Sequence, residues 1–406
     1  MGESQKQRLG GVQMFETYFR QQGVSYCVGL GVQLENIIDA YQEVRIKMIR
    51  NVPADFTRDE WAYLIAFLEK KNLLKPFEQN FGQQISEAPF EYYFKIKPRV
   101  ATWLPNNVSL LGPLTFTLLS LTGCKQKIKV GSHADNLLVK FIEYLRKHST
   151  SEELLSYLEK DVKVHQFDRM NPLNQDFSKW ADVRIVYGGD SAAASIDKMT
   201  HPINSMGVYF SNKKSEVWVE KDSITDSFCI DLIKVFSIYG QAGCTSPQKV
   251  CIVNGDSKDV LELKRKIFAL WPDNVNALPA QHLASENILA SQLAKIKGFE
   301  AQLLPQNSGV IYSGNPITEI ISSAMSLGIE ALSFDECIRS LPDNIQTIGV
   351  AFQKQETHQL LIRMLSETNI KRVVPVIQMH HFSNVWDGYN LFGQIFEQKE
   401  LSYSQF

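Results

Sequence analysis

The chain has 406 residues, 44% of them apolar and 21% charged, which is enough apolar material for two hydrophobic cores and predicts two domains. Its 42 basic and 44 acidic side chains nearly cancel, to a formal charge of −2, and no stripe of Lys or Arg is long enough to follow a phosphate backbone. We therefore expect neither a disordered chain nor a nucleic-acid partner.

The N-terminal residues and the cysteines indicate where the protein works. MGESQKQRLGG lacks the apolar core of a signal peptide, and the most apolar stretch, residues 100–121, is broken by Pro and Asn. The six cysteines are scattered without CxxC pairs, which is typical of reduced thiols and not of a disulfide scaffold or a zinc site. The sequence predicts a cytoplasmic protein with no membrane span and no metal site.

The first hundred residues are predicted to be helical. The clearest start is Thr57, because TRDE places Thr57 at the N-cap and Glu60 three residues later, as in a capping box. Apolar residues then recur with the period of a helix that packs on a core: Trp61, Leu64, Ile65 and Leu68. Nothing in this region indicates chemistry.

From residue 100 onward, strand-like runs alternate with helical stretches. KIKVGS (127–132) and DVRIVYGG (182–189) are each followed by a helical segment, DNLLVKFIEYLRKH and DSAAASIDKM. A second series of the same kind begins near residue 215: SEVWVEKD, DLIKVFSIYG, KVCIVNGD and VLELKRKIFALW. This order predicts an α/β fold with parallel sheets, whose loops after the strands bind ligands.

One cysteine lies in a loop suited to nucleophilic chemistry. IYGQAGCTSPQKVCIV (238–253) places Cys244 between a helical run and a β-branched strand, with small neighbours that leave its sulfur accessible. A loop that packs on a helix end lowers the thiol pKa from its ordinary value of about 8.5. Gly240 and Gly243 let backbone N–H groups approach a substrate oxygen. From spacing alone, a nucleophile and a small core cysteine are equally good interpretations.

Four segments, in this order, resemble the LuxC-type acyl-CoA reductases of the aldehyde dehydrogenase superfamily, which supply fatty aldehyde in bacterial bioluminescence. They are LPNNVSLLGPL (104–114), ADVRIVYGGDSAAASI (181–196), QAGCTSPQ (241–248) and RVVPVIQMHHFSNVWDG (372–388). The resemblance implies that the Cys244 thiolate attacks an acyl thioester and the carrier thiol leaves. NADPH or NADH then delivers hydride to the bound acyl group, and an aldehyde is released.

The resemblance also implies the architecture. We expect an aldehyde-dehydrogenase-like fold with a helical region and Rossmann-type cofactor domain over residues 1–215. A catalytic α/β domain would occupy 216–370, and a C-terminal segment, 371–406, would return across both. Relatives oligomerise by adding strands between subunits, so we expect a homo-oligomer. The acyl donor would be acyl-CoA or an acylated protein partner.

The remaining site residues are carried over from the family. Asn107 matches the amide donor to the oxyanion, with Asn106 as the alternative, and acts with the Cys244 backbone N–H. Lys129 matches a lysine that contacts the adenosine ribose or its 2′-phosphate. The helix that faces the cofactor pyrophosphate would begin with four residues: Gly188, Gly189, Asp190 and Ser191.

One departure from the superfamily favours reduction. Aldehyde-oxidising members carry a general-base Glu where this chain has Phe210. A reductase must avoid hydrolysis of its acyl-enzyme, so it has no need of this base. A shift of a few residues in the comparison leaves Glu216 and Glu220 as alternative bases.

The last anchor segment is expected to line the acyl channel. Its apolar wall would consist of Val376, Ile377, Met379, Phe382, Val385 and Trp386, and Trp386-Asp387-Gly388 is predicted to form a turn. His381 is the candidate catalytic histidine, since an ordinary pKa near 6.5 suits protonation of a leaving thiolate; a structural histidine is the alternative.

Three other functions stay open. An acyl-phosphate reductase needs a basic phosphate pocket, and CTSPQK offers only Lys249. An NAD(P)-dependent aldehyde dehydrogenase needs the missing general base. A non-catalytic acyl-carrier subunit needs no cofactor site, so Lys129 and the GGD loop argue against it.

Overall fold

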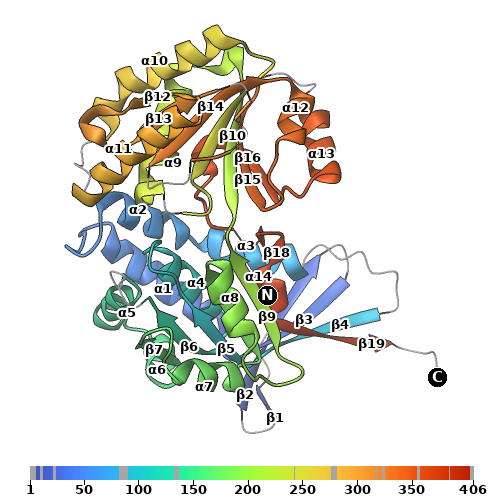
Figure 1. Ribbon diagram of the computed structural model, residues 1–406. Helices are drawn as coiled ribbons and strands as arrows, with labels where there is room; N and C mark the ends of the chain where they lie inside the picture. Colours follow the sequence, from blue (N-terminus) through green and yellow to red (C-terminus); the bar gives the residue numbers. More distant parts are fainter. Residues whose placement is uncertain are drawn as a thin grey trace. The chain divides into compact units, whose positions relative to one another are not determined.

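The computed structural model describes residues 6–402, apart from 10–11, 22–23, 82–89, 132–136, 242, 276–280, 315, 318, 322–324, 354–356 and 384. The chain divides into two compact units, which we call unit 1 (residues 1–211 and 389–406) and unit 2 (residues 212–388). Each unit combines helices with a parallel β-sheet (Figure 1), which confirms the predicted α/β class. Among the described residues, no helix is both long and apolar enough to cross a membrane.

Unit 1 begins with strands, so the prediction of a wholly helical first hundred residues is wrong. Five strands form one sheet in the order β1-β2-β3-β4-β19: β1 (Lys6–Leu9), β2 (Val12–Gln21), β3 (Val24–Leu30), β4 (Phe90–Ile96) and β19 (Phe396–Ser402). Their aromatic and β-branched residues suit strands. Besides β3, strand β4 pairs with β19 from the opposite end of the chain, and a pattern of neighbouring residues cannot predict such pairing.

The helical prediction is right between these strands, for α1 (Leu34–Met48), α2 (Arg58–Phe67) and α3 (Lys70–Phe81). The capping box is confirmed: Glu60 N donates to Thr57 Oγ1 at 3.2 Å, and Thr57 N donates to Glu60 Oε2 at 3.0 Å. Trp61, Leu64 and Leu68 are buried, so this face of the helix packs on the core as expected.

The second sheet of unit 1 is parallel, with strand order β7-β6-β5-β8-β9. Its strands are β5 (Arg99–Trp103), β6 (Lys125–Val130), β7 (Val162–Gln166), β8 (Val183–Gly188) and β9 (Met206–Ser211). The helices between them are α4 (Leu111–Ser120), α5 (Leu137–His148), α6 (Glu152–Lys160), α7 (Leu173–Trp180) and α8 (Asp190–Asp197). The chain runs outward from β5 to β7 and then crosses to β8. The gap between the ends of β5 and β8 is therefore a topological switch point, where open α/β sheets bind ligands.

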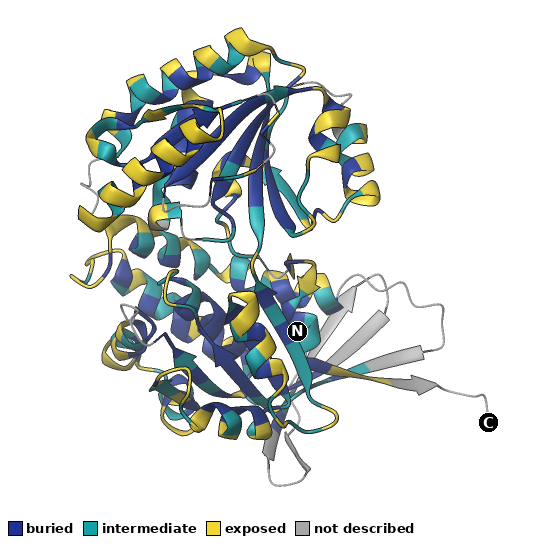
Figure 2. Cartoon of the chain, viewed as in Figure 1, coloured by how far each residue is buried: buried dark blue, intermediate teal, exposed yellow. Residues whose placement is uncertain are grey.

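Unit 2 contains a seven-stranded sheet, in the order β12-β13-β14-β11-β10-β15-β16. Its strands are β10 (Lys214–Glu220), β11 (Pro247–Val253), β12 (Glu300–Leu303), β13 (Val310–Ser313), β14 (Ser326–Leu332), β15 (Ile345–Ala351) and β16 (Arg372–Pro375). Only the β12–β13 pair among them is antiparallel. The central strands are buried (dark blue in Figure 2), because helices cover both faces of the sheet.

The covering helices of unit 2 are α9 (Asp226–Ser237), α10 (Ser257–Asn274), α11 (Gln281–Ile296), α12 (Phe334–Arg339) and α13 (Thr357–Glu367). The predicted second series corresponds to β10, α9, β11 and α10. Shorter elements complete the chain: η1 (Lys221–Ser223), η2 (Ile238–Gln241), η3 (Pro305–Asn307), η4 (Val376–Gln378), β17 (Val385–Trp386), β18 (Tyr389–Asn390) and α14 (Leu391–Gln394).

Candidate active site

Cys244 lies in the loop between η2 and β11, at the N-terminal edge of the unit 2 sheet. Five cysteine side chains are described, and Cys244 alone is partly exposed; the other four are buried. Ser215 Oγ donates to the carbonyl oxygen of Cys244 at 2.8 Å. Gln241 Nε2 donates to the carbonyl oxygens of Pro247 and Ser326, at 2.8 and 2.6 Å. These bonds fix the backbone on both sides of the thiol.

The ring of His380 anchors the same loop. His380 Nε2 lies 2.8 Å from the carbonyl oxygen of Val235, which can only accept, so Nε2 carries the proton. Nδ1 of the neutral ring then accepts from Thr245 Oγ1 at 2.7 Å. Burial lowers the pKa of His380 to about 4. Both nitrogens are engaged and the ring stays neutral, so we assign His380 to holding the loop.

His381, the sequence candidate, is exposed and follows the histidine that reaches the loop. Its backbone oxygen accepts from Arg372 Nη2 at 2.9 Å. Burial and the Arg372 charge lower the pKa of its ring, which is therefore largely neutral near pH 7. A role for His381 as a catalytic acid stays a prediction.

Asp387 is the residue that the sequence analysis missed. It is only 5% exposed, and neither carboxylate oxygen has a hydrogen-bond partner in the described part of the chain. Its φ of 52° is in the left-handed region, as is that of Gly388 at 78°. Burial raises the pKa of Asp387 to about 7, although Lys213 and Lys371 act in the opposite direction. Asp followed by Gly is an ordinary turn signal, and this hid the carboxylate.

The side chain of Gln346 belongs to the surroundings of Cys244. On β10, Lys214 pairs with Ile345 and Ser215 with Thr347, so Gln346 forms a bulge that has no partner on β10. Gln346 is 1% exposed, and among the described residues its amide has no hydrogen-bond partner of good geometry. The amide still contributes to lowering the pKa of the Cys244 thiol.

The pKa of Cys244 reflects opposing influences. Burial, and then the charge of Asp387, raises it to about 12. The Gln346 amide and the backbone N–H groups of Cys244 and Thr245 act in the opposite direction. The lowered thiol pKa expected from the sequence is therefore wrong, because burial outweighs the donors. The resting sulfur is a thiol that keeps its proton near pH 7, with donors around it that can stabilise negative charge when it develops.

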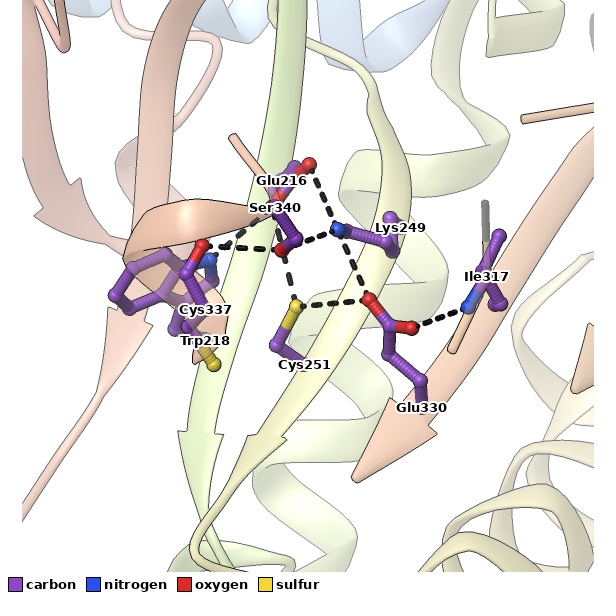
Figure 3. Close-up of polar contacts among 8 residues, drawn as sticks. All are labelled: Glu216, Trp218, Lys249, Cys251, Ile317, Glu330, Cys337 and Ser340. Carbon is purple, nitrogen blue, oxygen red and sulfur yellow. Dashed lines mark hydrogen bonds and ion pairs between the residues drawn. The ribbon is translucent and has the colours of Figure 1, made fainter. Parts of the chain in front are cut away.

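Glu216, an alternative base, and Lys249, the possible phosphate-binding lysine, belong to a separate cluster of buried side chains (Figure 3). Lys249 Nζ lies 3.3 Å from Glu216 Oε1 and 2.9 Å from Glu330 Oε1, and all three side chains are at most 3% exposed. Trp218 Nε1 donates to Glu216 Oε2 at 3.2 Å, and Ile317 N donates to Glu330 Oε2 at 2.7 Å. This ion network occupies Glu216 and Lys249, so neither forms an open base or phosphate pocket.

The expected cofactor residues lie at one edge of the second sheet of unit 1. Lys129 is near the end of β6, beside Trp103 at the end of β5. Asn106 and Asn107 follow β5, and the GGDS residues follow β8, so these loops flank the switch point between β5 and β8. A Cβ on Gly131 would collide with Asn106 Oδ1, so Asn106 is packed on that glycine. The assignment of Asn107 as the amide donor stays a prediction.

The start of α8 is open at its N-cap, and its assignment to the cofactor pyrophosphate stays a prediction. Gly189 is the N-cap, and a Cβ built there would meet no described atom within 4 Å. Backbone N–H groups at the start of a helix favour anionic oxygens, and this open space lets them approach closely. Lys129 is half-buried, with Nζ 5.9 Å from the centre of the Phe167 ring, and burial lowers its pKa.

The expected acyl-channel residues do not form one wall. Val376 and Met379 belong to the core of unit 2, whereas Ile377 and Val385 are 41% and 45% exposed. The centres of the Phe382 and Trp386 rings lie 5.3 Å apart. A channel lining from Phe382 and Trp386 stays a prediction.

Comparisons with known proteins give a family and a fold. A family model described as acyl-CoA reductase (LuxC) matches residues 34–395. No curated protein sequence matches the chain. An NAD-dependent aldehyde dehydrogenase from Sinorhizobium meliloti has a similar structure, with a TM-score of 0.67, 11% identity, and 91% of this chain and 82% of that chain covered. Aldehyde dehydrogenase 21 from Physcomitrella patens, in complex with succinate, is similar with a TM-score of 0.67, 12% identity, and 91% and 86% covered.

Proposed function

The chain belongs to the LuxC family of acyl-CoA reductases and has the fold of aldehyde dehydrogenases, and from this premise we propose that it reduces an acyl thioester through an acyl-enzyme on Cys244. The single observation that carries the proposal is the state of the cysteines. Only Cys244 among those described is partly exposed, and its loop is fixed by Ser215 and Gln241. The protein is thus an oxidoreductase whose product is an aldehyde.

The chemistry begins at the sulfur. Cys244 Sγ attacks the thioester carbonyl carbon, and the developing oxyanion is stabilised by the Cys244 backbone N–H and by the amide that we assign to Asn107. Collapse of the oxyanion breaks the bond to the carrier sulfur and leaves an acyl-enzyme. Reduction of this thioester needs a hydride, which a nicotinamide cofactor held by unit 1 would supply. Cys244 then acts as the leaving group when the aldehyde forms.

We assign cofactor binding to unit 1. Lys129 would contact the adenosine ribose or its phosphate, and Gly188, Gly189, Asp190 and Ser191 would receive the pyrophosphate. The open space over Gly189 supports this placement. One protein of similar fold is described as an NAD-dependent aldehyde dehydrogenase, which also supports a nicotinamide cofactor. We propose NADPH, with NADH as the alternative.

The acyl donor and the assembly complete the proposal. Acyl-CoA or an acylated protein partner would deliver the acyl group. Strands β1 and β19 are the edges of the five-stranded sheet, and exposed edges of this kind accept strands from another copy, so we propose a homo-oligomer. Light scattering of the purified protein tests this, and a monomer at working concentration contradicts it.

The decisive experiment is mass spectrometry of the intact protein incubated with a series of acyl-CoA esters without cofactor. An added mass equal to one acyl group is expected in the wild type and absent in Cys244→Ala. Cys229→Ala is the matched control, because Cys229 is buried in α9 and should keep the adduct. An adduct that persists in Cys244→Ala would remove the nucleophile assignment.

A further inference from the structure

We propose that the Asp387 carboxylate takes the proton of the Cys244 thiol as the sulfur attacks the acyl thioester, and then returns that proton to the leaving carrier thiol. The proposal rests on the Cys244 acyl-enzyme described above. It adds a proton-transfer group besides His381, the candidate from the sequence, at a site where Phe210 stands in place of the general-base Glu of aldehyde-oxidising members.

Asp387 combines three features that are each unfavourable for folding. Its carboxylate is 95% covered by protein, both oxygens lack a hydrogen-bond partner within the described residues, and its φ is 52°. Buried carboxylates are normally paired, and a left-handed backbone at a residue other than Gly stores strain. A buried carboxylate without a hydrogen-bond partner among the described residues is available to bind a proton during a reaction.

The segment that carries Asp387 is held against the Cys244 loop. His380, on this segment, bonds Thr245 next to Cys244 and also the backbone of α9. Arg372 donates to the backbone oxygens of Gln378, Met379 and His381, each at 2.9 Å, and its guanidinium lies 5.4 Å from the centre of the Trp386 ring. These contacts fix the backbone at residues 378–381 and place the Trp386 ring, next to Asp387 in the sequence, beside Arg372.

The thiol needs a proton acceptor. Because the pKa of Cys244 is raised to about 12, hardly any thiolate exists near pH 7, and the proton must leave as the carbon–sulfur bond forms. His380 already uses both ring nitrogens, and Lys213, Lys371 and Arg372 are cations that have no site for another proton.

Asp387 remains as the acceptor. With its pKa raised to about 7 by burial, it is ionised in about half of the molecules near neutral pH, so it can both take and return a proton. Its charge contributes to raising the pKa of the Cys244 thiol, so the two groups interact electrostatically, and Lys213 and Lys371 favour the ionised form of Asp387. The exposed His381 is the competing group, and the experiment separates the two.

The step balances in protons and electrons. The S–H bond of Cys244 breaks, its proton goes to Asp387, and the sulfur electron pair forms the new bond to the acyl carbon. The carbonyl electron pair moves to oxygen and returns when the bond to the carrier sulfur breaks. The carrier thiolate takes the proton from Asp387, which ends as a carboxylate beside an acylated Cys244.

The test compares the wild type with Asp387→Asn, because Asn tolerates a left-handed backbone better than most residues. Acyl-adduct formation is timed by mass spectrometry without cofactor, from about pH 5.5 to about pH 9. We expect the wild-type rate to rise with an apparent pKa near 7. At about pH 9 the variant should be acylated about 10²- to 10⁴-fold more slowly than the wild type, and its pH profile should lack this inflection. Asp343→Asn, an exposed position before β15, is the matched control and should behave as the wild type.

A second measurement separates a chemical from a structural role. Iodoacetamide reacts with the thiolate of Cys244 and needs no base in the transition state. Removal of the Asp387 charge should increase this alkylation above pH 8 or so while acylation falls, because the charge raises the thiol pKa. If both rates fell together with the melting temperature, Asp387 would be structural and the proposal wrong.

The outcomes also separate this proposal from the function on which it rests. A wild type that forms no adduct on Cys244 would overturn the proposed function and this inference with it. A wild type that is acylated, with Asp387→Asn acylated equally fast and with the same pH profile, would overturn the inference alone. An inflection that disappears in His381→Gln and persists in Asp387→Asn would assign the proton transfer to His381.

Discussion

Two groups of buried polar residues lie on either side of the start of β10, and they use carboxylates in opposite ways. Ser215 bonds the Cys244 loop, and the next residue, Glu216, belongs to the ion network with Lys249 and Glu330. Successive strand residues point to opposite faces of a sheet, so one strand supports both groups. In the network each carboxylate contacts a cation, whereas at the Cys244 site Asp387 has no hydrogen-bond partner among the described residues.

This difference shows how burial alone fails to identify function. Burial raises the pKa of both Glu216 and Asp387. Lys249 counteracts the effect at Glu216 and is itself neutralised by two carboxylates, so the network ties β10, β11 and β14 together. Asp387, in contrast, forms no hydrogen bond with the described residues through its carboxylate and so joins no strands. We therefore expect changes in the network to alter stability and changes at the Cys244 site to alter kinetics.

The largest effect expected from the network is that of Lys249→Met. It would leave Glu216 and Glu330 buried without their cation, and breaking a buried ion pair in this way costs about 3–5 kcal/mol. Urea unfolding measures the loss. Lys266→Met removes surface pairs with the partly exposed carboxylates of Asp226 and Glu262 and should cost about 1 kcal/mol or less. Equal losses in the two variants would mean that the network does not stabilise the sheet.

The next largest effect is expected on the kinetics of the Cys244 site. Asn107→Ala should slow acylation of Cys244 by about 10²- to 10³-fold, the usual result of losing one oxyanion donor, and leave the free energy of unfolding unchanged. The timed mass-spectrometry assay measures it. Asn106→Ala is the control, and a larger effect there would shift the assignment by one residue.

Asp387 should also make stability depend on pH. Its folded pKa of about 7 exceeds the ordinary 3.8, so the folded state holds a proton that the unfolded state has lost. Stability from this group is therefore lost as the pH rises from about 4 to about 7. Between about pH 5 and about pH 8 the free energy of unfolding of the wild type should fall by up to ~3 kcal/mol more than that of Asp387→Asn. Thermal unfolding at the two pH values checks this, and parallel curves would contradict the buried, unpaired carboxylate.

Local patterns predicted much of this molecule. The capping box at Thr57 and the alternation of strands and helices depend on neighbouring residues, and the structure bears out both features. Cys244 is partly exposed, but burial raises the pKa of its thiol where the sequence predicted a lower value. The resemblance to LuxC-type reductases is confirmed by the match over residues 34–395.

The features that escaped prediction depend on distant partners. Strand β4 pairs with β19, and the ion network joins three strands that are separated in sequence. Asp387 is unusual because of what surrounds it, since its local sequence is that of a turn. Gln346 is placed by a bulge, which follows from the register between β10 and β15 and from no local signal.

The smallest predicted effect concerns Gln346, and a close control is available on the other side of β10. Ser215 pairs with Pro247 and Glu216 with Lys249, so Gln248 forms a second bulge on β11. A buried amide without a hydrogen bond costs about 1–3 kcal/mol, so Gln346→Leu should be at least as stable as the wild type. The amide also lowers the pKa of the Cys244 thiol, so we expect it to donate a hydrogen bond to the sulfur once negative charge develops there. Its loss should then slow both acylation and alkylation about tenfold, the lower end of the value of a hydrogen bond to a charged group. Gln248→Leu should leave both rates unchanged. If the two variants behaved alike, the amide of Gln346 would have no specific effect on the sulfur, and Asp387 with the backbone N–H groups would account for the polar surroundings of Cys244.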